Sequence, residues 1–203
     1  MYMILASSFY EREDVVKIAT ELLGKVLVTN FDGHITSGMI VETEAYAGAT
    51  DKASHAYRNR RTARTEVMFM QGGAAYVYLC YGIHHLFNVV TNKQDIPHAV
   101  LIRGLAPLEG IDYMLERRGK EKLTPALTAG PGALSQALGI NTGHTGAALN
   151  TQDMYIEDRG IKVPKKDVIA ATRVGVAYAL DDALRPYRFY INGNPYVSKG
   201  KGL

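Results

Sequence analysis

Two hairpin patterns constrain the fold of this chain more than any other feature of its sequence. Each consists of an apolar run, a glycine-containing turn and a second apolar run: residues 25–29, Asp32-Gly33 and 36–46 in the first, and residues 74–80, Tyr81-Gly82 and 83–91 in the second. Because strands mostly follow strands along the chain, the pattern favours an α+β fold over a doubly wound parallel sheet.

The other segments are predicted from the spacing of their apolar residues and from glycine or proline at their ends. We expect helices at residues 11–23, 107–117 and 133–138, further strands at 99–103, 168–178 and 188–191, and loops at 48–65 and 141–149. No repeat or low-complexity linker interrupts the chain. Its 203 residues suffice for one buried core, so we expect a single domain over residues 1–203.

The composition excludes several classes of protein. The longest apolar runs are far shorter than the roughly 20 residues that cross a bilayer, and residues 1–8 do not resemble a signal peptide. The single cysteine, Cys80, excludes an internal disulfide and a cysteine-based zinc site. His84 and His85 are adjacent and point to opposite strand faces, so no metal site is expected. We therefore expect a cytoplasmic protein, nucleoid-associated if bacterial, that is neither secreted nor bound to a membrane.

The charge distribution is compatible with a nucleic-acid partner without requiring one. The formal net charge is +3, which many metabolic enzymes share. Five basic residues lie close together in the loop predicted at 48–65: Lys52, Arg58, Arg60, Arg61 and Arg64. A solvated loop would explain this cluster as well as a phosphate-binding surface would.

Two glutamates at a strand end are candidates for acid–base chemistry. Glu42 and Glu44 are two residues apart and therefore share one face of the predicted strand. An arbitrary pair of this kind is more often simply solvated. Apolar neighbours suggest partial burial, and Arg103, at the end of another predicted strand, can hold a carboxylate ionised and help to position a water molecule.

Aromatic residues gather in the same part of the sequence. Tyr76 and Tyr78 share one face of a predicted strand, which can indicate either core packing or a flat wall for a nucleobase. Tyr46 and His55 lie nearby in the sequence and could likewise either pack in the core or contact a base. Tyr81 differs because it lies at a hairpin bend, where burial is not expected and where an aromatic side chain can enter a base stack. Asn88 interrupts an apolar strand, either bonding a neighbouring loop or discriminating between bases.

Taken together, these residues resemble the alkyladenine (3-methyladenine) DNA glycosylase family. The matching segments run in order from about residue 24 to 198: Val41-Glu42-Thr43-Glu44-Ala45-Tyr46, Ser54-His55, Met68-Phe69-Met70, Tyr76-Val77-Tyr78-Leu79-Cys80-Tyr81-Gly82, Asn88-Val89, Val100-Leu101-Ile102-Arg103, Pro107-Leu108-Glu109-Gly110, Gly130-Pro131, Gln136-Ala137-Leu138 and Arg188-Phe189-Tyr190. Each segment is short, but the ordered set is specific.

The resemblance implies a reaction and a role for each matched residue. Glu44 would be the general base that activates water, held with Arg103 and a main-chain carbonyl near Val174 or Val176. Tyr46 and His55 would enclose a flipped base with Tyr78 at its edge, Asn88 would disfavour guanine, and Tyr81 would replace the extruded nucleotide. These roles follow from the resemblance, not from the spacing of the residues.

The same resemblance implies a compact α+β domain with a curved, largely antiparallel sheet, flanking helices and a protruding β-hairpin. It also implies no metal or organic cofactor, double-stranded DNA containing damaged purines as the partner, and a monomer. No lysine matches a catalytic position, so we expect hydrolysis without a Schiff base. The expected lesions are 3-methyladenine, 7-methylguanine, hypoxanthine and ethenoadenine.

The sequence also departs from the family pattern. Ala133 follows Gly130-Pro131-Gly132 where a lysine is usual, and Thr65 follows Arg64 where an asparagine is usual. These changes bear on DNA affinity and lesion range more than on the reaction. Two alternatives therefore remain: a catalytically weak nucleic-acid-binding homologue, and a metabolic enzyme in which Glu42 and Glu44 imitate a carboxylate pair.

Overall fold

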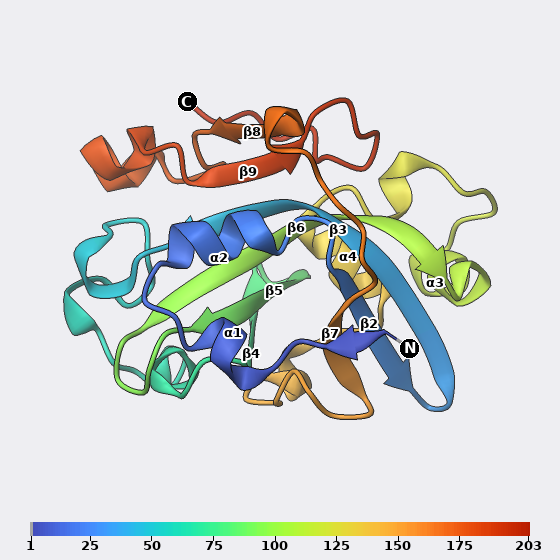
Figure 1. The fold of residues 1–203 in the computed structure, drawn as a ribbon, viewed down its shortest axis with the longest axis horizontal. Helices are drawn as coiled ribbons and strands as arrows, with labels where there is room; N and C mark the ends of the chain where they lie inside the picture. Colours follow the sequence, from blue (N-terminus) through green and yellow to red (C-terminus); the bar gives the residue numbers. More distant parts are fainter. Residues whose placement is uncertain (1) are drawn as a thin grey trace.

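The computed structural model describes residues 2–203, which form a nine-stranded sheet with helices packed against it (Figure 1). The order of the main path is β1-β7-β2-β3-β6-β5-β4, and β9, paired with β8, joins it at β3. All pairings between these strands are antiparallel, which confirms the predicted α+β class. The strands are β1 (Met3–Ile4), β2 (Val26–Phe31), β3 (His34–Tyr46), β4 (Ala75–Cys80), β5 (His84–Thr91), β6 (His98–Glu109), β7 (Met154–Asp158), β8 (Val168–Ala171) and β9 (Arg188–Ile191).

Both predicted hairpins are present with the expected turns. Asp32 and Gly33 have φ of 55° and 78° between β2 and β3, and Tyr81 and Gly82 have φ of 51° and 73° between β4 and β5. Two successive left-handed residues give the turn whose twist matches that of the flanking strands. The second hairpin therefore ends in a tight bend with Tyr81 at its tip.

The long strands β3 and β6 form the centre of the sheet and carry an irregularity that matters for the site. Glu42 pairs with Gly104 and Thr43 with Ile102, so Arg103 falls outside the regular register. Bulges of this kind redirect side chains. The strand predicted at 99–103 covers only the first half of β6, and Arg103 lies within that strand instead of at its end.

Four α-helices accompany the sheet in the described chain: α1 (Ser7–Tyr10), α2 (Val15–Glu21), α3 (Ile111–Arg118) and α4 (Pro131–Ala137). Helix α2 begins later than predicted because the Asp14 side chain accepts a hydrogen bond from the Lys17 N–H at 2.9 Å and caps it. Buried Ile18 and Ala19 pack α2 into the main core. Thr43 donates to the carbonyl of Ala19 at 2.9 Å, which fixes this helix on the strand that carries Glu42 and Glu44.

Two further predicted elements were wrong in their extent. The helix predicted at 107–117 begins only at Ile111, because β6 keeps pairing with β3 as far as Glu109 and Gly110 then turns the chain at φ 68°. The strand predicted at 168–178 ends at Ala171, because the residues beyond it turn inward. Val176 is buried, and residues 177–184 form 3-10 turns.

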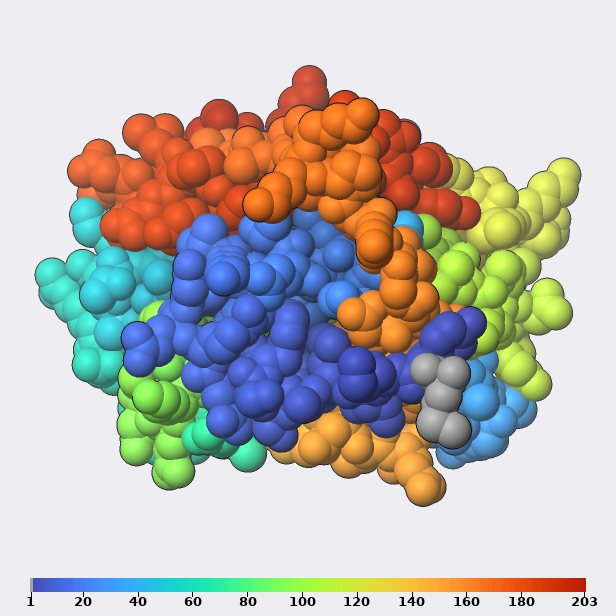
Figure 2. Space-filling view, viewed as in Figure 1, coloured from blue at the N-terminus to red at the C-terminus, as the bar shows by residue number. Residues whose placement is uncertain are grey.

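The strands β1 and β7 were not predicted, and they bring distant parts of the chain together. β1 pairs with β7, and β7 pairs with β2. In Figure 2 the red C-terminal part of the chain forms a band along the upper edge of the molecule, above the blue N-terminal part.

Within residues 2–203, no helix combines the length and apolar character needed to span a membrane.

Candidate active site

A cavity of about 660 Å³ opens between the β4–β5 hairpin, the loop after β3 and the segment after β8. Six of the seven residues singled out from the sequence line it: Tyr46, His55, Tyr78, Tyr81, Asn88 and Arg103. Apolar walls with a few convergent polar groups are typical of a ligand site. The seventh residue, Glu44, lies beneath the floor of the cavity and has no exposed surface.

Glu44 is a buried carboxylate surrounded by three donors. Its Oε1 accepts a hydrogen bond from the main-chain N–H of Val174 at 2.8 Å and lies 3.4 Å from Nη1 of Arg103. Its Oε2 accepts from the hydroxyl of Tyr46 at 2.8 Å. A buried carboxylate is tolerated only when it is paired and hydrogen-bonded. This arrangement supplies both conditions.

Arg103 lies between the two glutamates that the sequence placed on one strand face. Its Nε donates to Oε1 of Glu42 at 3.2 Å, while Nη1 faces Glu44. Burial opposes its charge, but the Glu44 and Glu42 carboxylates together raise the pKa of Arg103 above its usual value. The predicted contact of Arg103 with a carboxylate is therefore present, and it is made to both.

Glu42 is held by residues that sequence reasoning did not select. Its carboxylate accepts from Nε of Arg188 at 2.7 Å, and from the N–H and hydroxyl of Ser198 at 2.6 and 2.9 Å. In the sequence, Arg188 is distinguished only as part of a segment that matches the family. Ser198 lies 156 residues from Glu42 along the chain, so no local pattern could have indicated the contact.

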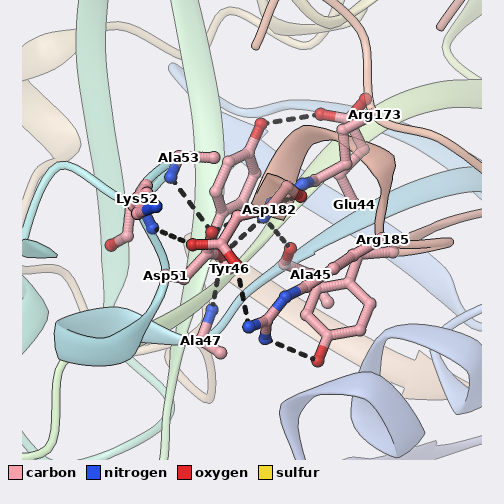
Figure 3. A network of polar contacts seen from close by, with 12 residues as sticks. Glu44, Ala45, Tyr46, Ala47, Asp51, Lys52, Ala53, Arg173, Asp182 and Arg185 are labelled. Carbon is pink, nitrogen blue, oxygen red and sulfur yellow. Dashed lines mark hydrogen bonds and ion pairs between the residues drawn. The ribbon is translucent and has the colours of Figure 1, made fainter. Parts of the chain in front are cut away.

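A second buried network supports the cavity from behind Tyr46 (Figure 3). Arg173 is fully buried and binds both carboxylate oxygens of Asp51, at 2.5 and 2.9 Å, and the carbonyls of Ala45 and Asp182 at 2.9 Å. Its guanidinium carbon lies 4.8 Å from the centroid of the Tyr46 ring. The ion pair between Arg173 and Asp51 connects the loop after β3 to the segment that contains Val174, whose N–H donates to Glu44.

Tyr46 is fixed by its contacts on both sides. Burial and the neighbouring Glu44 carboxylate raise the pKa of the Tyr46 hydroxyl well above its usual value. The hydroxyl therefore stays protonated and donates to Glu44, while the ring packs over Arg173. One tyrosine thus links the cavity wall to the buried carboxylate.

His55, Tyr76 and Tyr78 form an aromatic wall. The rings of His55 and Tyr78 meet edge to face with centroids 4.7 Å apart, and Nδ1 of His55 lies 2.8 Å from the hydroxyl of Tyr76. Burial, with Arg64 and Arg60 nearby, lowers the pKa of His55 to about 4. The imidazole is therefore neutral at physiological pH.

Asn88 and Tyr81 occupy opposite ends of the same hairpin. The amide nitrogen of Asn88 donates to the carbonyls of Tyr76 and Leu86 at 3.0 and 3.2 Å, which fixes the side chain in the cavity wall. These partners belong to strands β4 and β5, so the expected bond to a neighbouring loop is wrong, and discrimination between bases stays a prediction. Tyr81 is 91% exposed at the tip, as expected of a bend.

The basic residues of the loop after β3 do not act as one cluster. Arg61 forms ion pairs with Glu66 at 2.7 Å and Asp95 at 2.9 Å, and Arg58 packs over the ring of Tyr57. Arg64 alone among the arginines of this loop lines the cavity. Across residues 2–203, no three histidine, cysteine or acidic side chains group closely enough to hold a metal ion.

Comparisons with known proteins match nearly the whole chain. A sequence model of the family "Methylpurine-DNA glycosylase (MPG)" matches residues 8–195. Three bacterial relatives share the assigned name "Putative 3-methyladenine DNA glycosylase". The relative from Chlamydia pneumoniae is 46% identical over 190 residues, covering 93% of this chain and 95% of its own. That from Clostridium botulinum (strain Alaska E43 / Type E3) is 45% identical over 205 residues, covering 97% and 100%. That from Bacillus cereus (strain ATCC 14579) is 46% identical over 204 residues, covering 95% and 97%.

Proposed function

Because this chain belongs to the methylpurine-DNA glycosylase family, we propose that it excises damaged purines from double-stranded DNA by hydrolysis. The expected lesions are 3-methyladenine, 7-methylguanine, hypoxanthine and ethenoadenine, and the product is an abasic site. The observation that carries the proposal is the buried Glu44, held by Arg103 and Val174 directly beneath an aromatic cavity of about 660 Å³.

In the proposed reaction, Glu44 is the general base for water. The bond between C1′ of the sugar and the base nitrogen breaks, and its electron pair leaves with the base. Water attacks C1′ as positive charge develops there and passes its proton to Glu44. Arg103, with a main-chain carbonyl near Val174 or Val176, would hold this water, and the two charged side chains are already paired before substrate binds.

The aromatic walls suit a flipped purine. Tyr46 and His55 would enclose the base and Tyr78 would meet its edge. Asn88, fixed by two main-chain carbonyls, would disfavour guanine through its exocyclic amine. A cationic alkylated base gains further from the electron-rich faces of tyrosine rings.

Tyr81 is the proposed wedge that fills the space left by the flipped nucleotide. It is almost fully exposed on a hairpin tip beside the cavity, and Ile83 next to it is also exposed. Exposed apolar side chains at such a tip can separate stacked bases. We expect Tyr81→Asn, which keeps a residue suited to the left-handed turn, to weaken binding of lesion-containing duplex at least about tenfold; unchanged affinity and turnover would exclude this role.

Further features support a monofunctional enzyme. In the described chain no lysine lines the cavity, so no amine is placed to form a Schiff base with the sugar. The proposed site is built from one copy of the chain, and we propose that the protein acts as a monomer without a cofactor.

The proposal is tested by base release. Duplexes with a single hypoxanthine, ethenoadenine or 7-methylguanine, and methylated DNA for 3-methyladenine, are incubated with excess protein, and free base and abasic sites are quantified. Wild-type protein is expected to release base and leave the strand uncut, and Glu44→Gln to lose at least about a hundredfold in rate. Glu116→Gln, on α3 away from the cavity, is the matched control and is expected to retain full activity.

The outcomes separate the candidate functions. Lesion-specific binding without any base release would favour a non-catalytic nucleic-acid-binding homologue. Base release that survives intact in Glu44→Gln would retain the class of enzyme and refute the proposed base. The absence of both binding and release would contradict the whole proposal.

A further inference from the structure

Arg64 is a cation in the wall of the cavity that the sequence placed only in a basic cluster, without a role at the site. Its Nη2 lies 3.5 Å from Nε2 of His55, and its guanidinium carbon lies 4.8 Å from the centroid of the Tyr78 ring. It therefore lies where His55 and Tyr78, two of the residues proposed to contact the base, meet. It enters from the loop after β3, on the rim of the cavity.

The positive charge of Arg64 is not balanced within the protein. The other arginine lining the cavity, Arg103, is shared between Glu42 and Glu44. No carboxylate in residues 2–203 forms an ion pair with Arg64. A base entering between Tyr46 and His55 thus approaches one uncompensated cation.

The two ring nitrogens of His55 are both engaged within the protein, which leaves Arg64 as the donor at this corner of the cavity. Arginine has N–H donors and no acceptor, so its contact with His55 uses the lone pair of Nε2. Nδ1 then carries the proton toward the hydroxyl of Tyr76, 2.8 Å away. The lowered pKa of His55 agrees with this neutral form. An acceptor on the edge of a base would therefore meet the remaining N–H groups of Arg64 here.

We propose that Arg64 determines lesion preference by favouring neutral damaged purines, such as hypoxanthine, over cationic N-alkylpurines. The inference rests on the proposed glycosylase function and specifies the charge class of its substrate.

The chemistry of the leaving group gives the reason. A neutral purine leaves with the electron pair of the broken bond and develops negative charge, which a cationic donor at its edge stabilises. An N-alkylated purine is already positive and becomes neutral as it leaves, so it needs no such donor. Before the bond breaks, its charge is repelled by Arg64. Stabilisation of the departing neutral purine and repulsion of the cationic purine both favour neutral lesions. Both electrostatic effects become stronger when bound DNA excludes water from the cavity.

The test compares two duplexes of identical sequence, one with a single hypoxanthine and the other with a single 7-methylguanine. Single-turnover rates and dissociation constants are measured for wild type, Arg64→Gln and Arg58→Gln. We expect Arg64→Gln to lower the hypoxanthine rate about tenfold and to leave the 7-methylguanine rate equal or higher, so that the ratio changes about tenfold or more.

Arg58→Gln is the matched control, because it removes the same charge from the same loop at a position outside the cavity wall. It is expected to leave the ratio of the two rates unchanged. Arg64→Lys keeps the charge without the planar guanidinium, and we expect it to retain more of the wild-type ratio than Arg64→Gln.

Equal losses on both lesions for Arg64→Gln would mean that Arg64 binds a phosphate, and this would overturn the proposal, as would an unchanged or reversed ratio. Circular dichroism confirms that each variant is folded. Failure of wild type to release either base would refute the proposed function instead, so the two hypotheses fail in different ways.

Discussion

At the scale of single residues, the unusual feature of this protein is a chain of buried charges. Glu42, Arg103 and Glu44 lie in a row, and Arg188 and Ser198 close the row at the Glu42 end. Removing one member leaves the others buried and unpaired, which costs far more than the net contribution of a surface ion pair. In the proposed reaction, Glu42 would therefore act through Arg103, as a positioning residue.

Substitution of Glu42 tests this arrangement. Glu42→Gln removes the charge that orients Arg103 and leaves Arg188 without a counter-ion, so we expect unfolding free energy to fall by about 3 kcal/mol. Base release under single-turnover conditions is expected to slow by at least about tenfold while the dissociation constant for lesion DNA stays within about twofold. Glu66→Gln, which breaks only an exposed pair with Arg61, is the control and should change stability by less than about 1 kcal/mol. A rate for Glu42→Gln equal to that of wild type would show that Arg103 needs no such support.

The lowered pKa of His55 predicts how the stability of the protein depends on pH. Its pKa is about 4 in the folded protein, below the value of about 6.5 expected in the unfolded chain. As pH falls from about 6.5 to about 4, the unfolded chain takes up a proton that the folded chain does not, so stability falls in that window. Between pH 7.5 and pH 5, His55 is expected to remove about 2 kcal/mol of unfolding free energy.

Urea denaturation at the two pH values, for wild type and His55→Gln, measures this contribution. The decrease in unfolding free energy between pH 7.5 and pH 5 should be smaller by about 2 kcal/mol in His55→Gln than in wild type. His34→Gln, at an exposed histidine in the β2–β3 hairpin, should show the wild-type loss. Identical losses in all three proteins would mean that His55 is not held neutral by the cavity.

At the scale of elements, the segment after β8 has a strained position near the cavity. Leu180 has φ 54° and ψ −125°, a conformation that side chains rarely adopt, and it is 67% exposed. The same segment supplies Tyr178 to the cavity wall, and Asp182 accepts a hydrogen bond from the N–H of Lys52 at 2.9 Å. The turn is thus held by contacts on both sides of a residue that prefers another conformation.

Relief of this strain is expected to stabilise the protein. Leu180→Gly should raise unfolding free energy by about 1 kcal/mol, because glycine adopts positive φ without steric conflict and no buried contact is lost. Leu184→Gly, at an equally exposed leucine without positive φ, should lower it by roughly 0.5–1 kcal/mol. Thermal and urea unfolding measure both changes. A destabilised Leu180→Gly would show that the leucine side chain makes contacts that outweigh its strain.

The elements also show where sequence patterns succeed and where they fail. The hairpins were predictable because each depends on local alternation and on residues suited to a tight turn. The segment 168–178 was misread because alternating valines satisfy a strand pattern whether they pair in a sheet or line a cavity. The strand already ends at Ala171, and Gly175, with φ 75°, interrupts the extended backbone between the two valines beyond it.

At the scale of the whole molecule, the site is assembled from distant parts of the sequence. The candidate site residues on β3 and the hairpin were found because their residue types are chemically distinctive and resemble a known family. Arg173, Arg188 and Ser198 could not be found in this way, because their importance lies in partners 122 to 156 residues away. Sequence periodicity contains no information about such contacts.

The segment 198–203 offers a prediction at this scale. A chain ending at Val197 loses both hydrogen bonds from Ser198 to Glu42, and we expect unfolding free energy to fall by about 3 kcal/mol and base release to slow strongly. Ser198→Ala keeps the main-chain N–H bond and should lose only about 1 kcal/mol. Urea denaturation separates the two, and a truncated chain as stable and active as wild type would contradict the importance of this contact.

The distance between Glu42 and Ser198 along the chain also has a consequence in time. Ribosomes add about 5–20 residues per second, so the 156 residues that separate the two require roughly 8 to 30 seconds. Throughout that interval the strand that carries Glu42 and Glu44 exists without the two hydrogen bonds that Ser198 donates to Glu42. A growing or prematurely released polypeptide would therefore contain the residues proposed to bind a base, but it could not release a base from DNA. Activity would begin only when synthesis is nearly finished.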